Sequence, residues 1–201
     1  MITAVLFDFG GVLSRFGHAG DLLSRVAVTL GADRRLVNSQ VGELFEQVLC
    51  GKLPTSAFWL QASELLGRPA ADYDALWRAN EPREFEILYY NFARQLRDRG
   101  LATGILSNVF PTSVPLIRAA GGYRDFFPTV LSCEVGLLKP EPSIYKLALA
   151  RLHNRPAAEV LLIDDQPASR AAAEALGMGT LAATTDPREM IALIETKLAT
   201  G

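Results

Sequence analysis

Residues 2–13, with the sequence ITAVLFDFGGVL, decide how the rest of the chain is interpreted. The stretch opens with an apolar run rich in β-branched and aromatic side chains, which predicts a buried strand. Asp8 follows this run directly, and Gly10 and Gly11 come next. Open α/β sheets place their ligands at the carboxyl ends of such strands. Because an aspartate is expensive to bury without a cation, Asp8 either caps the next turn or belongs to a charged site.

The composition indicates a globular protein in water. The chain has 201 residues, enough for one domain or a domain with a large insert. Its net charge of −2 argues against a nucleic-acid groove or an anionic membrane surface. No apolar run approaches the ~20 residues of a membrane helix, and the N-terminus lacks the basic region of a signal peptide. We therefore expect a cytoplasmic protein without nucleic-acid or membrane partners. The sequence does not indicate its oligomeric state.

The two cysteines, Cys50 and Cys133, are too few for a disulfide framework and lack the spacing of metal ligands. We expect both to be buried, reduced thiols.

The region after the first strand is predicted to be all-helical. Residues 19–80 carry apolar side chains at helical spacing, with no strand-like alternation, and the fourth helix is expected at 72–80. Pro54 suits the first turn of the third helix. We interpret residues 16–82 as an inserted helical domain, with 1–15 and 83–201 forming the main domain. Trp59 and Trp77 are expected in the core of the insert rather than in a ligand cage.

From residue 84 onward the pattern alternates between helix and strand. Further strands are predicted at 101–106, 129–132, 160–163 and 180–182, and helices at 85–99, 111–120, 142–152, 168–176 and 187–198. Such alternation predicts an α/β fold with a Rossmann-like parallel sheet and helices on both faces.

Polar residues follow three of the predicted strands: Asp8, then the pair Ser107-Asn108, then the pair Asp164-Asp165. Lys139 lies in a loop between a strand and a helix. In a parallel sheet these positions share the carboxyl edge and can converge. Taken singly, Ser107-Asn108 could cap the following helix and Lys139 could be a solvated loop lysine. The adjacent acids repel each other unless a cation or protons intervene, so the four positions together indicate a site.

The same residues carry a family resemblance. The chain resembles the haloacid dehalogenase (HAD) superfamily, whose four motifs correspond here to DFGGV at 8–12, LSN at 106–108, KP at 139–140 and IDD at 163–165. The resemblance covers the whole chain, and the helical insert is similar to the family's C1-type cap. The glycine pair in DFGGV is similar to members regarded as sugar-1-phosphate phosphatases.

The resemblance implies a nucleophile and a metal site. Asp8 would attack a phosphoryl group and form an aspartyl-phosphate. Mg²⁺ would lie between Asp8, the main-chain carbonyl of Gly10 and Asp165, with waters completing an octahedron. Asp164 would support the metal from beside.

The resemblance also implies three contacts to the phosphoryl group. Ser107 would donate a hydrogen bond to it, the main-chain amide at Asn108 would do the same, and Lys139 would neutralise charge on both Asp8 and the phosphoryl oxygens. The expected partner is a small phosphorylated metabolite.

Gly10 departs from the common phosphatase pattern, which has at this position a second aspartate that protonates the leaving oxygen. Loss of a general acid typically lowers the rate about 10²–10⁴-fold. A substrate with a good leaving group, such as a sugar 1-phosphate, depends less on this acid. His18 is the best-placed substitute in the sequence, with Arg15 nearby for an anionic substrate.

Two alternatives remain open. A 2-haloacid dehalogenase also lacks the second aspartate and needs no metal, but its fourth motif is not a pair of acids like Asp164-Asp165. A catalytically weak domain kept for binding or regulation would explain Gly10, but it has no need for Asp8, Lys139 and Asp165.

Overall fold

A parallel five-stranded sheet forms the centre of the molecule. The computed structural model describes residues 1–14, 22–81 and 85–200. The strands are β1 (Ala4–Phe7), β2 (Ala102–Ser107), β3 (Thr129–Leu131), β4 (Val160–Asp164) and β5 (Gly179–Ala182). They lie in the order β3-β2-β1-β4-β5, and every neighbouring pair is parallel. The predicted α/β fold is therefore confirmed.

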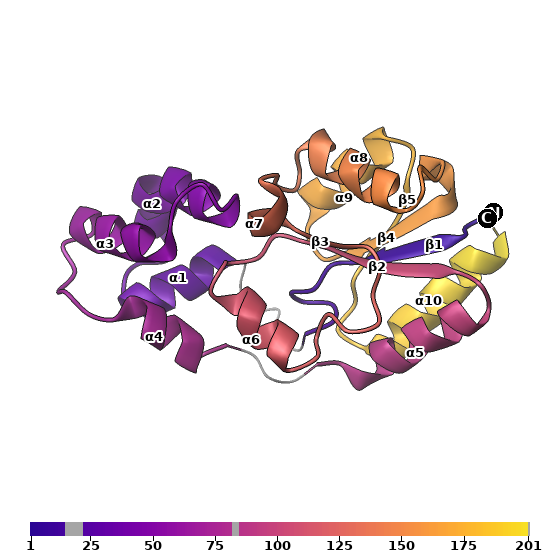
Figure 1. Cartoon of the computed structure of the whole chain (residues 1–201), viewed down its shortest axis with the longest axis horizontal. Helices are drawn as coiled ribbons and strands as arrows, with labels where there is room; N and C mark the ends of the chain where they lie inside the picture. Colours follow the sequence, from indigo (N-terminus) through magenta and orange to yellow (C-terminus); the bar gives the residue numbers. More distant parts are fainter. Residues whose placement is uncertain (15–21, 82–84, 201) are drawn as a thin grey trace.

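Strand β1 is central because its side chains are apolar on both faces. Val5 and Phe7 pack with residues of α5 (Ile87–Asp98) and α10 (Pro187–Thr200). Ala4 and Leu6 pack with residues of α8 (Pro142–Arg151) and α9 (Pro167–Ala175) on the other face. Figure 1 shows these two helical layers on either side of the sheet. The chain leaves β1 for β2 on one side and reaches β4 on the other, so a topological switch point lies at the end of β1.

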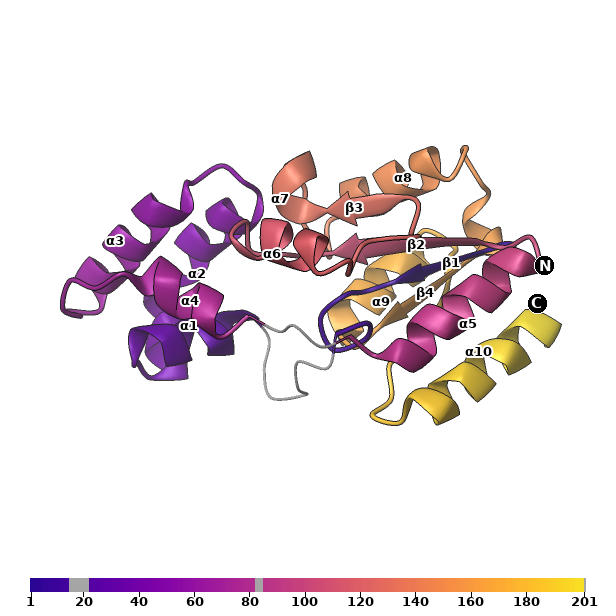
Figure 2. The same ribbon diagram turned by 60° about the horizontal axis from the view of Figure 1, so that its bottom comes forward.

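The inserted region folds into four helices, named here the helical module: α1 (Leu22–Leu30), α2 (Arg34–Leu49), α3 (Thr55–Leu65) and α4 (Tyr73–Ala79). Figures 1 and 2 show the module beyond the end of the sheet at which β1 ends. Trp59 and Trp77 are buried in its core, as predicted. Pro54 is the N-cap of α3 rather than part of its first turn. The predicted domain boundaries, between 15 and 16 and between 82 and 83, lie outside the described residues.

The helical module shares its apolar core with loops of the sheet. Phe110, beyond the end of β2, and Leu138, next to Lys139, belong to the same buried cluster as the module's aromatic side chains. The rings of Trp77 and Phe110 have centroids 4.4 Å apart. Two loops that carry predicted site residues are thus packed directly into the module.

Several local predictions need correction. Ser132, expected at the end of a strand, begins the short helix α7 (Ser132–Val135), which ends at Gly136 in the left-handed conformation. This turn leaves Cys133 only partly buried, whereas Cys50 is buried as predicted; neither forms a disulfide. Helix α6 (Ser113–Ala119) begins two residues after Pro111. Within the described ranges, no helix has the length and apolar character to span a membrane.

Candidate active site

Three strand ends bring the predicted site residues together. Phe7 pairs with Ile105 of β2 and with Ile163 of β4, so Asp8 lies between the strands that lead to Ser107 and to Asp164. The amide of Asp8 donates to the carbonyl of Ile163 at 2.8 Å, which continues the sheet past the end of β1. The carboxylates of Asp8, Asp164 and Asp165 have oxygens that all lie within 4.8 Å of one another.

Lys139 connects two of these carboxylates. Its Nζ lies 3.1 Å from Oδ2 of Asp8 and donates to Oδ2 of Asp164 at 2.6 Å. The three side chains are buried, while Asp165 is more exposed. The second oxygen of Asp164 accepts from the amide of Gln166 at 2.8 Å, so both of its oxygens are engaged within the chain.

The charges at this site perturb one another. Burial raises the pKa of Asp8 to about 7; Lys139 lowers it, the acids Asp164 and Asp165 raise it, and the hydroxyl of Ser107 lowers it. Burial by itself lowers the pKa of Lys139, but Asp8 and Asp164 outweigh burial and hold that pKa above its usual value. Three carboxylates and one ammonium group leave an excess of negative charge. The donor set, three carboxylates with hard oxygens, is the kind that Mg²⁺ prefers.

The loop after β4 is held by side chains that the sequence analysis did not identify. Nη1 of Arg170 donates to the carbonyl oxygens of both Asp164 and Asp165, at 2.8 and 2.9 Å. Nε2 of Gln166 donates to Oδ2 of Asp165 at 3.0 Å. Arg170 lies on α9, five residues after Asp165. In the sequence, its contact could have been suspected only from an arginine near the start of the helix that follows the acidic pair.

The side chain of Asn108 clamps the backbone of Lys139. Its Nδ2 donates to the carbonyl of Lys139, and its Oδ1 accepts from the amide of Lys139, both at 2.9 Å. The family resemblance implies a role only for the main-chain amide of Asn108, and the sequence by itself also allowed a helix cap, so this clamp was not predicted. The clamp joins the loop after β2 to the loop that carries the lysine, and it thereby fixes where the Lys139 ammonium lies.

We expect Asn108→Ala to lower the free energy of unfolding by about 1–3 kcal/mol, because it leaves the amide of Lys139 without its acceptor. Urea unfolding followed by circular dichroism measures the change. Asn38→Ala, at an exposed position of α2, is the matched control and should stay within about 0.5 kcal/mol. Equal stability of the two variants would contradict a structural role for the clamp.

A cavity of about 450 Å³ lies between the carboxyl edge of the sheet and the helical module. Asp8, Gly10, Ser107, Lys139 and Asp165 line one part of it. A Cβ built on Gly10 meets no atom within 4 Å, so the glycine leaves open space there. Gly11 has φ +75° and lies against Asp165, since a Cβ there would be 3.1 Å from its Oδ2. Arg15 and His18 lie outside the described residues.

A hydrogen-bonded network joins the module to the sheet at the wall of this cavity. Nε1 of Trp77 donates to Oγ of Ser113 at 2.9 Å, and Ser113 donates to Oε2 of Glu81 at 2.6 Å. Arg25 pairs with Glu81 at 3.0 Å, and its guanidinium carbon lies 4.1 Å from the centroid of the Trp77 ring. These bonds connect α1, α4 and α6 and hold the module against the sheet.

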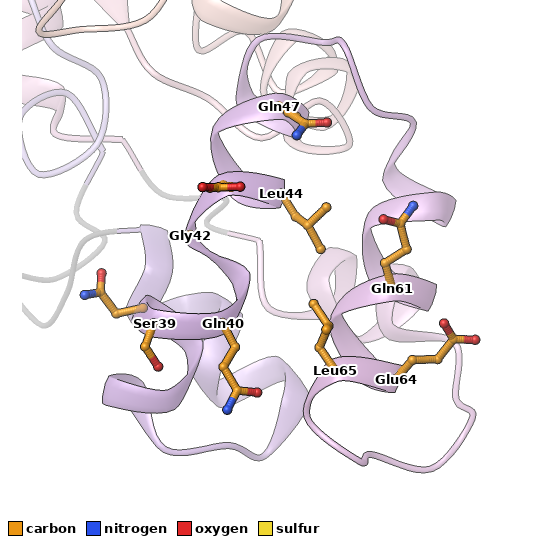
Figure 3. Close-up of a pocket in the computed structure, with 10 residues that line it drawn as sticks. Ser39, Gln40, Gly42, Leu44, Gln47, Gln61, Glu64 and Leu65 are labelled. Carbon is orange, nitrogen blue, oxygen red and sulfur yellow. The ribbon is translucent and has the colours of Figure 1, made fainter.

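A second hollow, of about 740 Å³, lies on the module between α2 and α3. Figure 3 shows Leu44 and Leu65 facing each other across it, with Gln40, Gln61 and Glu64 around them. None of the predicted site residues that the structure describes lines this hollow. The cavity at Asp8 is therefore the candidate active site.

Tyr145 packs its helix and does not line the cavity. The side chain is fully buried and its hydroxyl donates to the carbonyl of Ser169 at 2.9 Å, which ties α8 to α9.

The comparison with protein families identifies the class. A family model described as haloacid dehalogenase-like hydrolase matches residues 2–177. The chain belongs to this family, and it is a hydrolase of the HAD superfamily. The four motifs named above lie inside the matched range.

Two curated relatives are similar in sequence. The sesquiterpene phosphatase astK of Aspergillus oryzae is 26% identical over 182 residues, which cover 87% of this chain and 86% of that protein. The mouse acyl-CoA dehydrogenase family member 10 is 31% identical over 119 residues, which cover 56% of this chain and 10% of that much longer protein.

Solved structures share the fold. A HAD-like family hydrolase from Porphyromonas gingivalis has a TM-score of 0.77 at 24% identity and covers 100% of this chain and 99% of its own. A HAD family enzyme from Bacteroides thetaiotaomicron, in complex with magnesium and inorganic phosphate, has a TM-score of 0.74 at 22% identity, covering 94% and 99%. An L-2-haloacid dehalogenase has a TM-score of 0.65 at 22% identity, covering 96% and 99%. At these identities the similarity describes the fold alone.

Proposed function

We propose that the protein is a Mg²⁺-dependent phosphatase that acts on a small phosphorylated metabolite through an aspartyl-phosphate on Asp8. The observation that carries the proposal is the convergence of Asp8, Asp164, Asp165 and Lys139 beside a cavity that Asp8, Lys139 and Asp165 line. The sequence similarity to a phosphatase over 87% of the chain supports the same reaction class.

The donor set supports a divalent cation. We assign it to Asp8, Asp165 and the main-chain carbonyl of Gly10. Asp164 acts from beside, in keeping with its two engaged oxygens. When bound, the cation neutralises charge on the phosphoryl oxygens and on the carboxylates, which otherwise exceed the single ammonium of Lys139. The Mg²⁺ and phosphate in the Bacteroides relative support this choice of ion.

The residues then act in two displacements. A carboxylate oxygen of Asp8 attacks phosphorus, and the bond to the leaving oxygen breaks with both electrons remaining on that oxygen. Water then attacks the phosphorus of the aspartyl-phosphate, the bond to Asp8 breaks, and inorganic phosphate leaves with the carboxylate restored. Ser107, the amide of Asn108 and Lys139 stabilise the negative charge on the phosphoryl oxygens.

Gly10 restricts the leaving group. With no acid at this position, the leaving oxygen departs unprotonated or takes its proton from water, so a weakly basic leaving group reacts best. A sugar 1-phosphate is one such substrate, and it is the example that the resemblance to the DxGGV members implies. His18 and Arg15 stay predictions for acid and anion contacts. The helical module would serve as the cap that excludes water from the reacting centre, in a protein that we place in the cytoplasm.

The test is phosphate release from a panel of phosphorylated metabolites, with Mg²⁺ and with EDTA, for the native protein and Asp8→Asn. Release that needs both Mg²⁺ and Asp8 supports the proposal. Tight binding of one metabolite without release would favour a binding or regulatory domain. Chloride release from 2-chloropropionate in EDTA would favour a dehalogenase, the reaction named for one structural relative.

We expect Gly10→Asp to raise phosphate release from alkyl phosphates, which have poor leaving groups, by at least about tenfold, since a general acid contributes about 10²–10⁴-fold. A Cβ at position 10 meets no atom within 4 Å, so the backbone there can carry a side chain. Steady-state rates on an alkyl phosphate and an aryl phosphate measure the effect, which should be smaller on the aryl ester. Gly42→Asp adds a carboxylate in open space on α2 and serves as control. An equal change on both esters would argue against the acid as the missing group.

A further inference from the structure

The cavity has two chemically different parts. The part described above holds the carboxylates and Lys139. Facing it are four apolar side chains of the helical module, named here the apolar wall: Leu22 and Leu23 from α1, and Phe45 and Leu49 from α2. Val109 and Ile117 from the sheet side also line the cavity. The volume of about 450 Å³ is in the range of about 300–1,000 Å³ of small-molecule sites.

Phe45 and Leu49 of the apolar wall belong to the buried core of the module, whereas Leu22 and Leu23 lie outside that buried cluster. Leu22 and Leu23 remain half-buried at the edge of the module's buried cluster, although they stand next to each other in the sequence. Apolar surface that stays open inside a cavity, with catalytic-type carboxylates at the other end, is the usual lining of a ligand site.

Among the residues that the structure describes, the polar groups lining the cavity are mostly engaged within the chain. Arg25 pairs with Glu81, and Glu81 also accepts from Ser113. The side-chain amide of Asn108 is hydrogen-bonded to the backbone of Lys139, and Oγ of Ser14 donates to the carbonyl of Phe9. A ligand rich in hydroxyl groups would have to break such bonds to be satisfied, whereas an apolar ligand displaces only water from the wall.

We propose that the apolar wall binds the body of the substrate, so that, among phosphate esters with a weakly basic leaving group, the enzyme prefers those of apolar compounds such as phenols to sugar 1-phosphates. This inference rests on the proposed phosphatase function for the phosphoryl end. It assigns substrate selection to α1 and α2, whose side chains reach the cavity opposite Asp8.

The test uses 4-alkylphenyl phosphates with alkyl groups of none, two, four and six carbons, because the alkyl group extends the apolar area while the leaving phenolate stays equally basic. With Mg²⁺ present, kcat/KM should rise up to about fourfold per methylene, the burial energy of one methylene converted to a rate ratio. The kcat/KM for α-D-glucose 1-phosphate should be lower than that for 4-hexylphenyl phosphate. The inference is overturned if kcat/KM does not rise with the length of the alkyl group, or if kcat/KM for glucose 1-phosphate exceeds that for 4-hexylphenyl phosphate.

Leu23→Asn tests the wall itself and should flatten the rise with chain length. The control is Leu60→Asn on α3, where the leucine is 60% exposed and does not line the cavity; the rise should persist in this variant. Equal slopes in the two variants would overturn the assignment to the wall. A thermal melt of each variant confirms that it is folded.

Failure of the phosphatase proposal has a separate signature. If phenyl phosphate is turned over with Mg²⁺ and Asp8→Asn is inactive, the phosphatase proposal holds whatever the chain-length series shows. If no ester is turned over, the affinities of the matching 4-alkylbenzylphosphonates, measured by calorimetry, still test whether the apolar wall binds the alkyl group. Affinity that rises with chain length then supports the wall, and affinity that does not rise overturns it.

Discussion

Asp8→Asn is expected to lower Mg²⁺-dependent phosphate release by at least about 10⁴-fold, because removal of a covalent nucleophile leaves only binding and electrostatic effects. The fold should persist. An asparagine oxygen can still accept from the amide of Phe9, which donates to Asp8 at 2.7 Å, and Lys139 keeps its bond to Asp164. Because the change removes one of three clustered carboxylates, the thermal midpoint should be equal or higher.

Three measurements check this expectation: phosphate release under saturating Mg²⁺, a thermal melt, and intact mass after rapid quenching with substrate. The native protein should show a fraction carrying one added phosphoryl group, and Asp8→Asn should show none. Asp98→Asn, at an exposed position at the end of α5, is the control and should behave as the native protein. More than about 1% of native activity in Asp8→Asn would exclude the covalent route.

The sequence predicted the sheet and the residues at its edge for one physical reason. Fully buried parallel strands have continuous apolar runs, and polar residues directly after such runs can only lie at the carboxyl edge. Asp8, Ser107 and Asp164 each end or follow a run of this kind. Their convergence then depends on strand order, and β1 lies between β2 and β4.

The sequence does not show which way a side chain points or which distant residue it contacts. The clamp of Asn108 on Lys139 joins residues 31 positions apart, and no local pattern distinguishes it from a helix cap. The apolar wall has the same difficulty: Leu22, Leu23, Phe45 and Leu49 follow helical spacing whether they face the module's own core or a cavity. The short helix α7 has too few residues for a periodic signal, so Ser132 was assigned to the strand before it.

Lys139→Met tests whether the lysine holds the site together as well as acting on the substrate. Methionine keeps most of the buried stem but removes the charge, so Asp8 and Asp164 lose the ammonium at 3.1 and 2.6 Å. We expect phosphate release to fall about 10²–10³-fold, as when one electrostatic donor is removed. In EDTA the free energy of unfolding should fall by about 3–5 kcal/mol, because a buried carboxylate pair is left without its partner.

Added Mg²⁺ should recover part of that stability, since a cation among the same carboxylates takes over the balancing of charge. The thermal midpoint of Lys139→Met should therefore rise with Mg²⁺ more than that of the native protein does. Lys146→Met, at an exposed position of α8, is the control and should show neither effect. Lost activity with unchanged stability in EDTA would mean that Lys139 serves only the phosphoryl group. Lost stability in EDTA with a Mg²⁺-dependent recovery would mean that Lys139 stabilises the carboxylate cluster by balancing its charge, and that Mg²⁺ binds to the same cluster.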